Sequence, residues 1–155
     1  MWETRTVFFV HKKNVDPDFK GYASTKGKIV GMIRGGSYHD SFWKVFPYQD
    51  KEKKKLNSFL SPAKNTEQNL KMLAVGRIDL AILDRTVGQV TLRKLGLQDK
   101  ITFYDIPLYS KGYPMPFARK SAYPGIADIA KNFDAELAAM KKNGEYQAIL
   151  ARWLK

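Results

Sequence analysis

The chain has 155 residues, of which 44% are apolar and 27% are charged, so its composition is that of one globular domain rather than of a disordered segment. It contains no cysteine, which excludes disulfides, thiolate catalysis and cysteine-based metal sites. No apolar run approaches the ~18 residues that a membrane span requires. The first five residues lack the basic start and apolar run of a signal peptide, so we expect either a cytosolic protein or a chain that begins inside a longer one.

The net charge of +12 and the pI of about 9.8 permit binding to nucleic acid or to another anionic surface. The lysines are nevertheless spread along the chain, and the only dense run is at residues 51–55, which is typical of an exposed loop or a helix start. This run has neither the aromatic pattern of an RNA-binding motif nor the spacing of a zinc finger. We therefore interpret the charge as a basic surface and expect no nucleic-acid partner.

Strand and helix patterns alternate along most of the chain. β-Branched and aromatic residues predict a strand at residues 6–10, and a polar segment with prolines and glycines predicts a connecting loop at 14–28. A short apolar strand at 28–33 precedes a helix at 38–46, which Pro47 limits. The next helix begins near Asn65, where Gln68 completes a variant of the capping box, and it ends where Gly76 can adopt the left-handed conformation.

The second half of the chain continues this alternation. A buried strand is predicted at 78–83 and a helix at 86–95, with Val87, Val90 and Leu95 as its inward residues and Gly96 at its end. Another strand follows at 101–104, then a proline-rich connection at 107–116 and a strand remnant at 117–120. Apolar spacings of three and four predict a helix at 126–140, and Asn143 and Gly144 separate it from a short closing helix at 146–153. The whole pattern predicts an α/β fold with a mostly parallel sheet and flanking helices.

The segment Arg34-Gly35-Gly36-Ser37-Tyr38 is the first candidate site, because it lies between a predicted strand and a predicted helix. Ligands of α/β sheets gather beyond the carboxyl ends of strands, and a helix start binds anions such as a carboxylate. Glycines allow close approach to the backbone, and the hydroxyls of Ser37 and Tyr38 can add hydrogen bonds. On its own, the pattern favours a tight turn in which Ser37 is the N-cap of the helix.

Asp84 is the second candidate, since it also ends a strand and precedes a helix. Its carboxylate would suit an ammonium group such as the α-amine of an amino acid. Capping of the following helix is the simpler role for an Asp at this place. One anion site and one cation site on neighbouring strand ends together predict a pocket for a zwitterion.

The other reactive side chains show no spacing or motif that predicts a metal site or a catalytic site. His11 and His39 have no partners at metal-ligand spacing, and Asp79 and Asp105 do not form a spaced acid pair. The sequence shows no Ser-His-Asp or Cys-His arrangement and no phosphate-binding motif. We therefore expect a protein that is not an enzyme and that uses neither a metal nor a cofactor.

Three segments resemble, in order, motifs of the family 3 bacterial solute-binding proteins of polar amino-acid ABC transporters. Residues 27–38 resemble the family's GKxVGxxxGTxY segment, residues 69–84 its LxxGRxDAxxxxD segment, and residues 133–149 its C-terminal NxALxxLxxDGxYxxI pattern. The resemblance implies the type II periplasmic binding fold, in which two lobes joined by crossing strands enclose the ligand. It also implies a periplasmic location.

Carried over to this sequence, the resemblance places Gly36, Ser37 and Tyr38 where the second lobe binds the ligand carboxylate, and Asp84 where an acid binds the α-amino group. Arg34 borders the same cleft. Most of the first lobe of a full member is missing. The resemblance then implies a crossover strand and lobe-one remnant at 1–18, a ligand-binding second lobe at 19–105, a return crossover at 106–120 and C-terminal helices of lobe one at 121–155.

The resemblance implies capture of a small amino acid-like solute and its delivery to a membrane permease. The same fold also serves as the sensing input module of signalling proteins, and a basic nucleic-acid binder and a dehydratase-like enzyme are weaker alternatives. Because the absent lobe would leave the apolar face of the helix at 126–140 uncovered, we expect this face to pack on a second copy of the chain.

Overall fold

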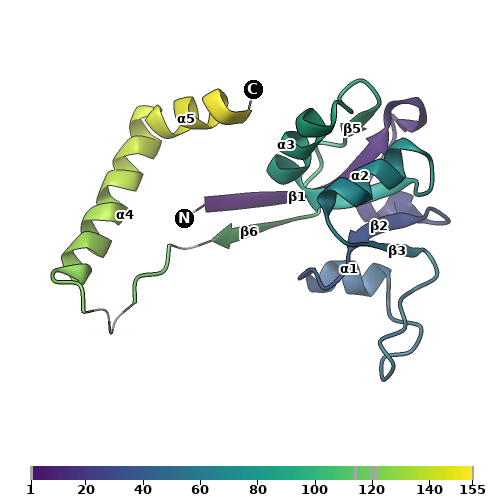
Figure 1. Cartoon of the computed structure of the whole chain (residues 1–155), viewed down its shortest axis with the longest axis horizontal. Coiled ribbons are helices and arrows are strands. Elements are labelled where there is room, and N and C mark those ends of the chain that lie inside the picture. Colours follow the sequence, from purple (N-terminus) through teal and green to yellow (C-terminus); the bar gives the residue numbers. More distant parts are fainter. Residues whose placement is uncertain (1, 114, 119, 121, 155) are drawn as a thin grey trace. The chain divides into compact units, whose positions relative to one another are not determined.

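The computed structural model describes residues 2–113, 115–118, 120 and 122–154 of the chain. Contacts within the chain divide it into a larger unit, Glu3–Gly112, and a smaller unit that contains Tyr113–Lys155 with the first two residues. Figure 1 shows the sheet and the helices α1 to α3 of the larger unit, and the helices α4 and α5 of the smaller one.

Among the described residues, six strands form one sheet at the centre of the larger unit. The order is β3-β2-β4-β1-β5, and β6 pairs with β1 outside this path. β2 pairs in parallel with β3 and β4, whereas β1 runs antiparallel to β4 and β5. Four strands therefore run in one direction against β1, which confirms the predicted, mostly parallel α/β sheet. The strands are β1 (Trp2–His11), β2 (Val30–Ile33), β3 (Leu60–Ala63), β4 (Leu80–Asp84), β5 (Ile101–Phe103) and β6 (Tyr109–Tyr113).

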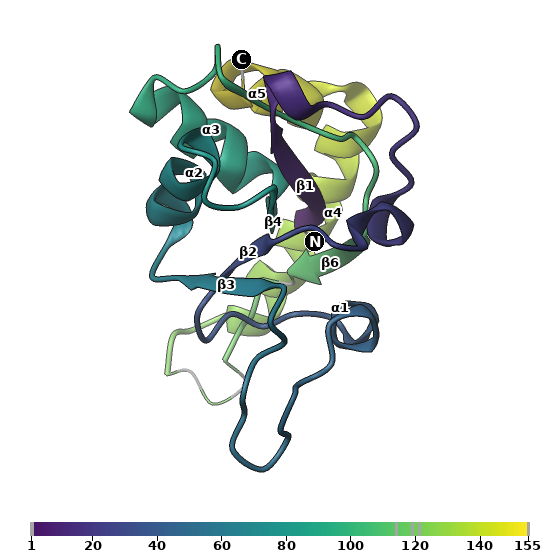
Figure 2. The same cartoon turned by 90° about the vertical axis from the view of Figure 1, so that its right-hand side faces the viewer.

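Helices cover both faces of this sheet. α1 packs on one face, and α2 and α3 lie side by side on the other (Figures 1 and 2). Short 3-10 turns lie in the segment between β1 and β2, which the sequence predicts as a loop. The α-helices are α1 (Asp40–Val45), α2 (Thr66–Ala74) and α3 (Arg85–Leu95), and the 3-10 turns are Lys12–Asn14 and Gly21–Thr25.

β1 contributes to the core on both of its faces, because its side chains alternate between two buried clusters. Phe8 and Val10 lie in the cluster that includes Phe42 of α1, whereas Val7 and Phe9 lie in the cluster beneath α2 and α3. All four of these β1 residues are at most 2% exposed. A strand that is buried on both faces reads as a continuous apolar run, as the sequence at 7–10 does.

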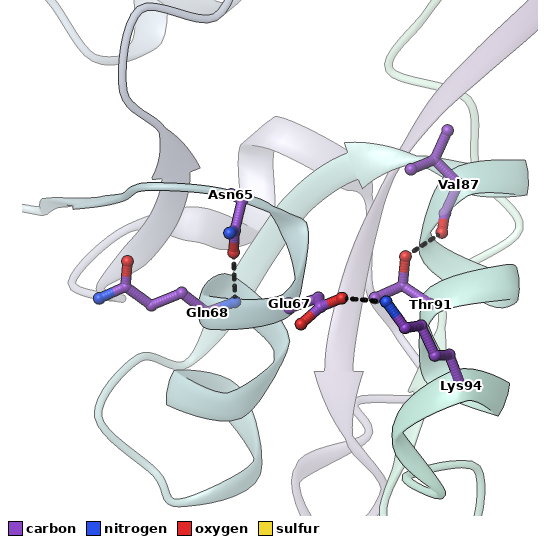
Figure 3. A network of polar contacts seen from close by, with 6 residues as sticks. All are labelled: Asn65, Glu67, Gln68, Val87, Thr91 and Lys94. Atoms are coloured by element: carbon purple, nitrogen blue, oxygen red, sulfur yellow. Dashed lines mark hydrogen bonds and ion pairs between the residues drawn. The ribbon is translucent and has the colours of Figure 1, made fainter.

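The start of α2 is fixed by side-chain hydrogen bonds that the sequence predicts in part (Figure 3). The Oδ1 atom of Asn65 accepts a hydrogen bond of 2.9 Å from the Gln68 N–H. The Oε1 atom of Gln68 accepts one of 2.7 Å from the Lys64 N–H, so the return bond of this capping box reaches one residue further back than the usual pattern. Between the two helices, the Lys94 ammonium contacts the Glu67 carboxylate at 2.7 Å (Figure 3).

Two strands have no counterpart in the sequence prediction. β3 contains Pro62, which interrupts its apolar pattern but is tolerated because β3 is an edge strand of the sheet. β6 lies inside residues 107–116, so the prediction of a mere connection there is wrong. The strand remnant predicted at 117–120 is absent at Phe117 and Ala118, and Arg119 lies outside the described residues. The ends of α2 and α3 are as predicted, since Gly76 and Gly96 have φ values of +72° and +63°.

The inward face of α3 also differs from the prediction. Val87 and Val90 are 50% and 47% exposed, so they do not face the core. Gly88 and Leu92 are the buried residues instead. A Cβ atom at Gly88 would overlap the ring of Phe9, so the helix approaches β1 closely only because this position is glycine. The contact rotates α3 and turns both valines toward solvent.

The smaller unit consists of α4 (Ile126–Asn143) and α5 (Glu145–Leu154), separated by Gly144 with φ +86° as the sequence predicts. The rings of Phe117 and Phe133 meet edge to face at 5.7 Å. Within this unit α4 has no buried residue, and Ile129 is 41% exposed. None of the helices in the described residues combines the length and the apolar character that a membrane crossing needs.

The close contact of α3 with β1 predicts that Gly88→Ala destabilises the protein. Alanine favours a helix over glycine by about 1 kcal/mol, but overpacking a core costs about 1–3 kcal/mol or more. Because Phe9 is fully buried, we expect the overpacking cost to exceed the gain in helix propensity, with a net loss of up to about 2 kcal/mol in the free energy of unfolding. Urea denaturation measures this loss, with Val90→Ala on the exposed face of α3 as the control. Equal stability of the two variants would contradict the proposed contact.

Candidate functional site

The two segments singled out in the sequence meet at one edge of the sheet. β2 and β4 are parallel neighbours, with Gly31 opposite Ala81, so their carboxyl ends point the same way. Continuing this register places Arg34 at the level of Asp84. The Arg34 N–H donates a hydrogen bond of 2.8 Å to the carbonyl of Ala63, which ties the start of the turn to the end of β3.

The turn after β2 depends on its two glycines. Gly35 has φ +72°, which favours glycine, and the Gly36 N–H donates to the Ile33 carbonyl at 3.1 Å. A Cβ atom at Gly36 would lie 3.0 Å from the Tyr38 ring and 3.1 Å from the Ile33 carbonyl oxygen. The residues from Arg34 to Ser37 are exposed, and the N–H groups of Gly35 and Ser37 have no hydrogen-bond partner among the described residues. The turn therefore presents donors for an anion.

Tyr38 braces this turn from within the fold. Its hydroxyl accepts a hydrogen bond of 2.6 Å from the Ile33 N–H, and its ring stacks on Phe42 with centroids 4.5 Å apart. Burial raises the pKa of Tyr38 to about 12, and the hydrogen bond from the Ile33 backbone offsets part of this rise. Since the hydroxyl is already bonded to the backbone, Tyr38 positions the turn, and the exposed Ser37 is the hydroxyl better placed for a ligand.

The start of α1 lies later than the sequence suggests. His39 is the N-cap, because its Nδ1 atom accepts a hydrogen bond of 3.2 Å from the Ser41 N–H. Ser37 is therefore not the N-cap. α1 has six residues, too few for a strong helix dipole, so the donors of the turn itself are the main feature that favours an anion here.

Asp84 has one engaged carboxylate oxygen and one free one. Its Oδ1 atom accepts a hydrogen bond of 2.9 Å from the Val87 N–H and so caps α3. Its Oδ2 atom is buried and has no hydrogen-bond partner in the structure. A buried carboxylate oxygen without a partner is costly, and an ammonium donor would relieve that cost. One carboxylate oxygen of Asp84 therefore caps α3, while the other lacks a hydrogen bond in the structure.

Two residues near Asp84, Thr6 and Arg85, are not predicted from the sequence as part of the site. Thr6 of β1 lies directly opposite Asp84 in the antiparallel register. Arg85 forms an ion pair of 3.0 Å with Asp105, and its guanidinium lies over the Phe103 ring at 5.1 Å from the centroid. The Asp105 side chain is 61% exposed, so this pair contributes at most about 1 kcal/mol and mainly fixes the segment after β5 against α3.

Among the described residues, neither a cavity nor a group of metal-binding side chains offers a better candidate site than this edge of the sheet. A shallow cavity of about 200 Å³ lies between α3 and β5, but none of the six predicted site residues lines it. No group of three or more His, Asp or Glu side chains in the described part of the chain could hold a metal ion.

Comparison with known proteins identifies the fold. No protein-family model matches the chain, and no curated protein matches it. Solved structures do match. The arginine-, lysine-, histidine-binding protein ArtJ from Geobacillus stearothermophilus has a TM-score of 0.62 at 21% identity, over 98% of this chain and 59% of its own. A histidine kinase sensor domain with similarity to periplasmic binding proteins has a TM-score of 0.59 at 22% identity, over 98% and 59%.

A third match is the GluR0 ligand-binding core in complex with L-glutamate, with a TM-score of 0.68 at 13% identity over 99% of this chain and 61% of its own. The chain spans about three-fifths of the length of these structures. The matches show that the chain has the type II periplasmic-binding fold, which confirms the predicted fold class and resemblance. The partial coverage fits a chain that holds only part of a two-lobed structure.

The divided role of Asp84 predicts different effects for two substitutions. Asn caps a helix as well as Asp does, whereas Ala cannot, and loss of a cap costs about 1 kcal/mol. We expect Asp84→Ala to lower the free energy of unfolding by about that amount and Asp84→Asn to preserve or raise it, because Asn also removes a charge from the unpartnered oxygen. Urea denaturation of both variants tests this, and an equal loss in both would rule out capping as the structural role.

Proposed function

We propose that this chain is the ligand-binding lobe of an extracytoplasmic solute-binding protein that captures a small zwitterionic solute of the amino-acid class for an ABC transporter. The observation that carries the proposal is the free, buried Oδ2 atom of Asp84 at the same sheet edge as the exposed donors of Gly35 and Ser37. One group favours a cation and the other an anion. An amino acid carries both charges a few bonds apart.

The proposed binding follows from the charges at this edge. The ammonium group of the ligand donates to Asp84 Oδ2 and supplies the hydrogen bond that this atom lacks. The carboxylate accepts from the N–H groups of Gly35 and Ser37, and the exposed guanidinium of Arg34 adds a charge-assisted bond. Gly36 keeps the backbone open to the ligand, and Tyr38 holds the turn in place. No bond in the solute is made or broken, so the proposed protein is not an enzyme.

The similar solved structures support this ligand class at a coarse level. ArtJ is named for binding arginine, lysine and histidine, and the GluR0 core holds L-glutamate, so the fold accommodates amino acids of opposite charge. We further propose delivery to a membrane permease, because ABC transport is the setting of another match, a substrate-binding domain of an amino acid ABC transporter from Streptococcus pneumoniae. The periplasmic location that we propose rests on the sequence resemblance to the family 3 solute-binding proteins.

A sensing role is the second candidate function. The match to a histidine kinase sensor domain favours it, since that protein uses the same fold to read a signal. Both functions require the same binding site. They differ in the output, which is delivery of the solute in one case and a signal through a membrane-linked partner in the other.

Ligand binding predicts a thermal shift that depends on the charge of Asp84. A solute that binds only the folded state stabilises it by about 2.7 kcal/mol at 100 times its dissociation constant, which raises the Tm by several degrees. We expect such a shift with one class of amino acid, and none with its N-acetyl derivative, which lacks the ammonium group. Asp84→Asn should abolish the shift while the helix cap is kept.

Asp105→Asn is the matched control, since it removes an exposed carboxylate from the neighbouring segment without touching the cap. Its thermal shift should equal that of the unaltered protein. An undiminished shift in Asp84→Asn, or a shift of the same size with the N-acetyl derivative, would contradict the proposed ammonium site. No shift with any amino acid would contradict binding by this chain.

The apolar face of α4, which its own unit does not bury, supports a homo-oligomer. Ile129 is 41% exposed, and the helix has no buried residue within its own unit. Burial of such a face is favourable by about 25 cal/mol per Å² of apolar surface. We expect a dimer in light scattering at micromolar concentration and a shift toward monomer in Ile129→Glu. A strictly monomeric unaltered protein would overturn this expectation.

A further inference from the structure

The lysine run at residues 51–55 forms the tip of an ordered loop between α1 and β3. This long loop projects away from the sheet (Figures 1 and 2). Asp50 and Lys55 form an isolated antiparallel bridge, with the Lys55 N–H bonded to the Asp50 carbonyl at 2.9 Å. The Gln49 N–H bonds to the Lys55 carbonyl, also at 2.9 Å. The loop therefore closes as a small hairpin.

The turn of this hairpin is held by backbone atoms and by Asp50, so the lysine side chains are not needed to shape it. The Oδ1 atom of Asp50 accepts a hydrogen bond of 3.0 Å from the Lys53 N–H. The four lysine side chains at the tip are all exposed, against one glutamate, Glu52. The structure thus concentrates positive charge on a convex tip. We name this group the lysine tip, and it consists of Lys51, Lys53, Lys54 and Lys55.

Exposed apolar side chains lie at the two ends of the same loop. Val45 at the end of α1 is 38% exposed, and Phe59 just before β3 is 45% exposed. The two ends are tied together, because the Asn57 amide donates to the Pro47 carbonyl at 3.3 Å and the Phe59 N–H donates to Asn57 Oδ1 at 3.0 Å. Exposed valine and phenylalanine therefore flank the base of the hairpin that carries the lysine tip.

We propose that the lysine tip, with Phe59, docks the protein on an anionic lipid bilayer. This inference is independent of the proposed solute binding. Lysines near an anionic membrane surface attract it by long-range electrostatics, and exposed aromatic and aliphatic side chains insert at the headgroup boundary. Long lysine side chains keep their charges at the headgroups while their stems cover apolar surface.

A bilayer fits this surface better than a nucleic acid does. The tip is a convex hairpin without a groove that could follow a phosphate backbone, and it contains no arginine for bidentate phosphate recognition. No aromatic residue alternates with the lysines to stack on bases. A flat, fluid layer of anionic headgroups requires neither groove nor stacking platform, only charge and an apolar contact.

Vesicle co-sedimentation of the full chain tests the proposal. We expect binding to vesicles of phosphatidylcholine mixed with phosphatidylglycerol and little binding to vesicles of phosphatidylcholine alone. Each lysine at an anionic surface accounts for about a fivefold change in affinity. Replacing all four lysines of the tip by glutamine should therefore weaken binding by at least about 100-fold. Phe59→Ser should weaken it several-fold, including at about 0.5 M salt, where charges are largely screened.

A matched variant separates a dedicated surface from a general effect of the +12 charge. It removes four exposed lysines from elsewhere on the larger unit and leaves the tip intact. The lysines replaced by glutamine in this control are Lys12, Lys13, Lys64 and Lys100. Circular dichroism confirms that both variants are folded. The control should bind anionic vesicles within about fivefold of the unaltered protein.

Three outcomes would overturn the proposal. Equal weakening of the tip variant and the control would show that net charge alone attracts the lipid. Equal binding to neutral and anionic vesicles would exclude the electrostatic contact. Binding of a single-stranded oligonucleotide that depends on the lysine tip, without binding to vesicles, would assign the surface to nucleic acid instead.

Discussion

The pairing of β2 with β4 begins at Asp79, whose backbone and side chain both bind Ile29. The Ile29 N–H donates to Asp79 Oδ2 at 2.7 Å, and the Ile29 carbonyl accepts from the N–H groups of Asp79 and Leu80 at 2.9 and 3.2 Å. These bonds fix which residues of two parallel strands face each other. The carboxyl ends of both strands then reach the same edge of the sheet, where the turn at Arg34 and the end of β4 at Asp84 lie.

The same pairing sets what the helices can do. A Cβ atom at Gly31, in the middle of β2, would overlap the side chain of Asn69 in α2. The fully buried Asn69 can therefore pack against β2 only because position 31 is glycine. On the other side of the sheet, α1 places Phe42 in the core and thereby positions Tyr38 against the Ile33 backbone. The candidate site is thus held from both faces of the sheet, while its turn from Arg34 to Ser37 remains exposed.

Local signals in the sequence predict much of this fold but little of the bonding within the site. Apolar runs and glycine stops predict β2, β4, α2 and α3 to within a few residues, because they depend on neighbours in the chain. β3 escapes this reasoning, since Ser61 and Pro62 interrupt its apolar run and only pairing with β2 makes it a strand. The sequence places the candidate residues at strand ends. It cannot show that His39 replaces Ser37 as the cap or that Arg85 pairs with Asp105, because these contacts depend on side-chain packing between segments.

β1 is apolar on both faces, so the alternation of polar and apolar residues cannot by itself set its register against β4 and β5. Side-chain volume sets it instead. The ring of Phe9 occupies the space that the absent Cβ of Gly88 leaves beneath α3, whereas Phe8 meets the rings of Phe19 and Tyr22 edge-on at 5.8 Å on the opposite face. A slip of one residue that brings Val10 over Gly88 would leave this space partly empty and turn Phe9 into the aromatic cluster. A single glycine, distant in sequence, therefore disfavours an alignment that hydrophobicity alone would leave nearly equal.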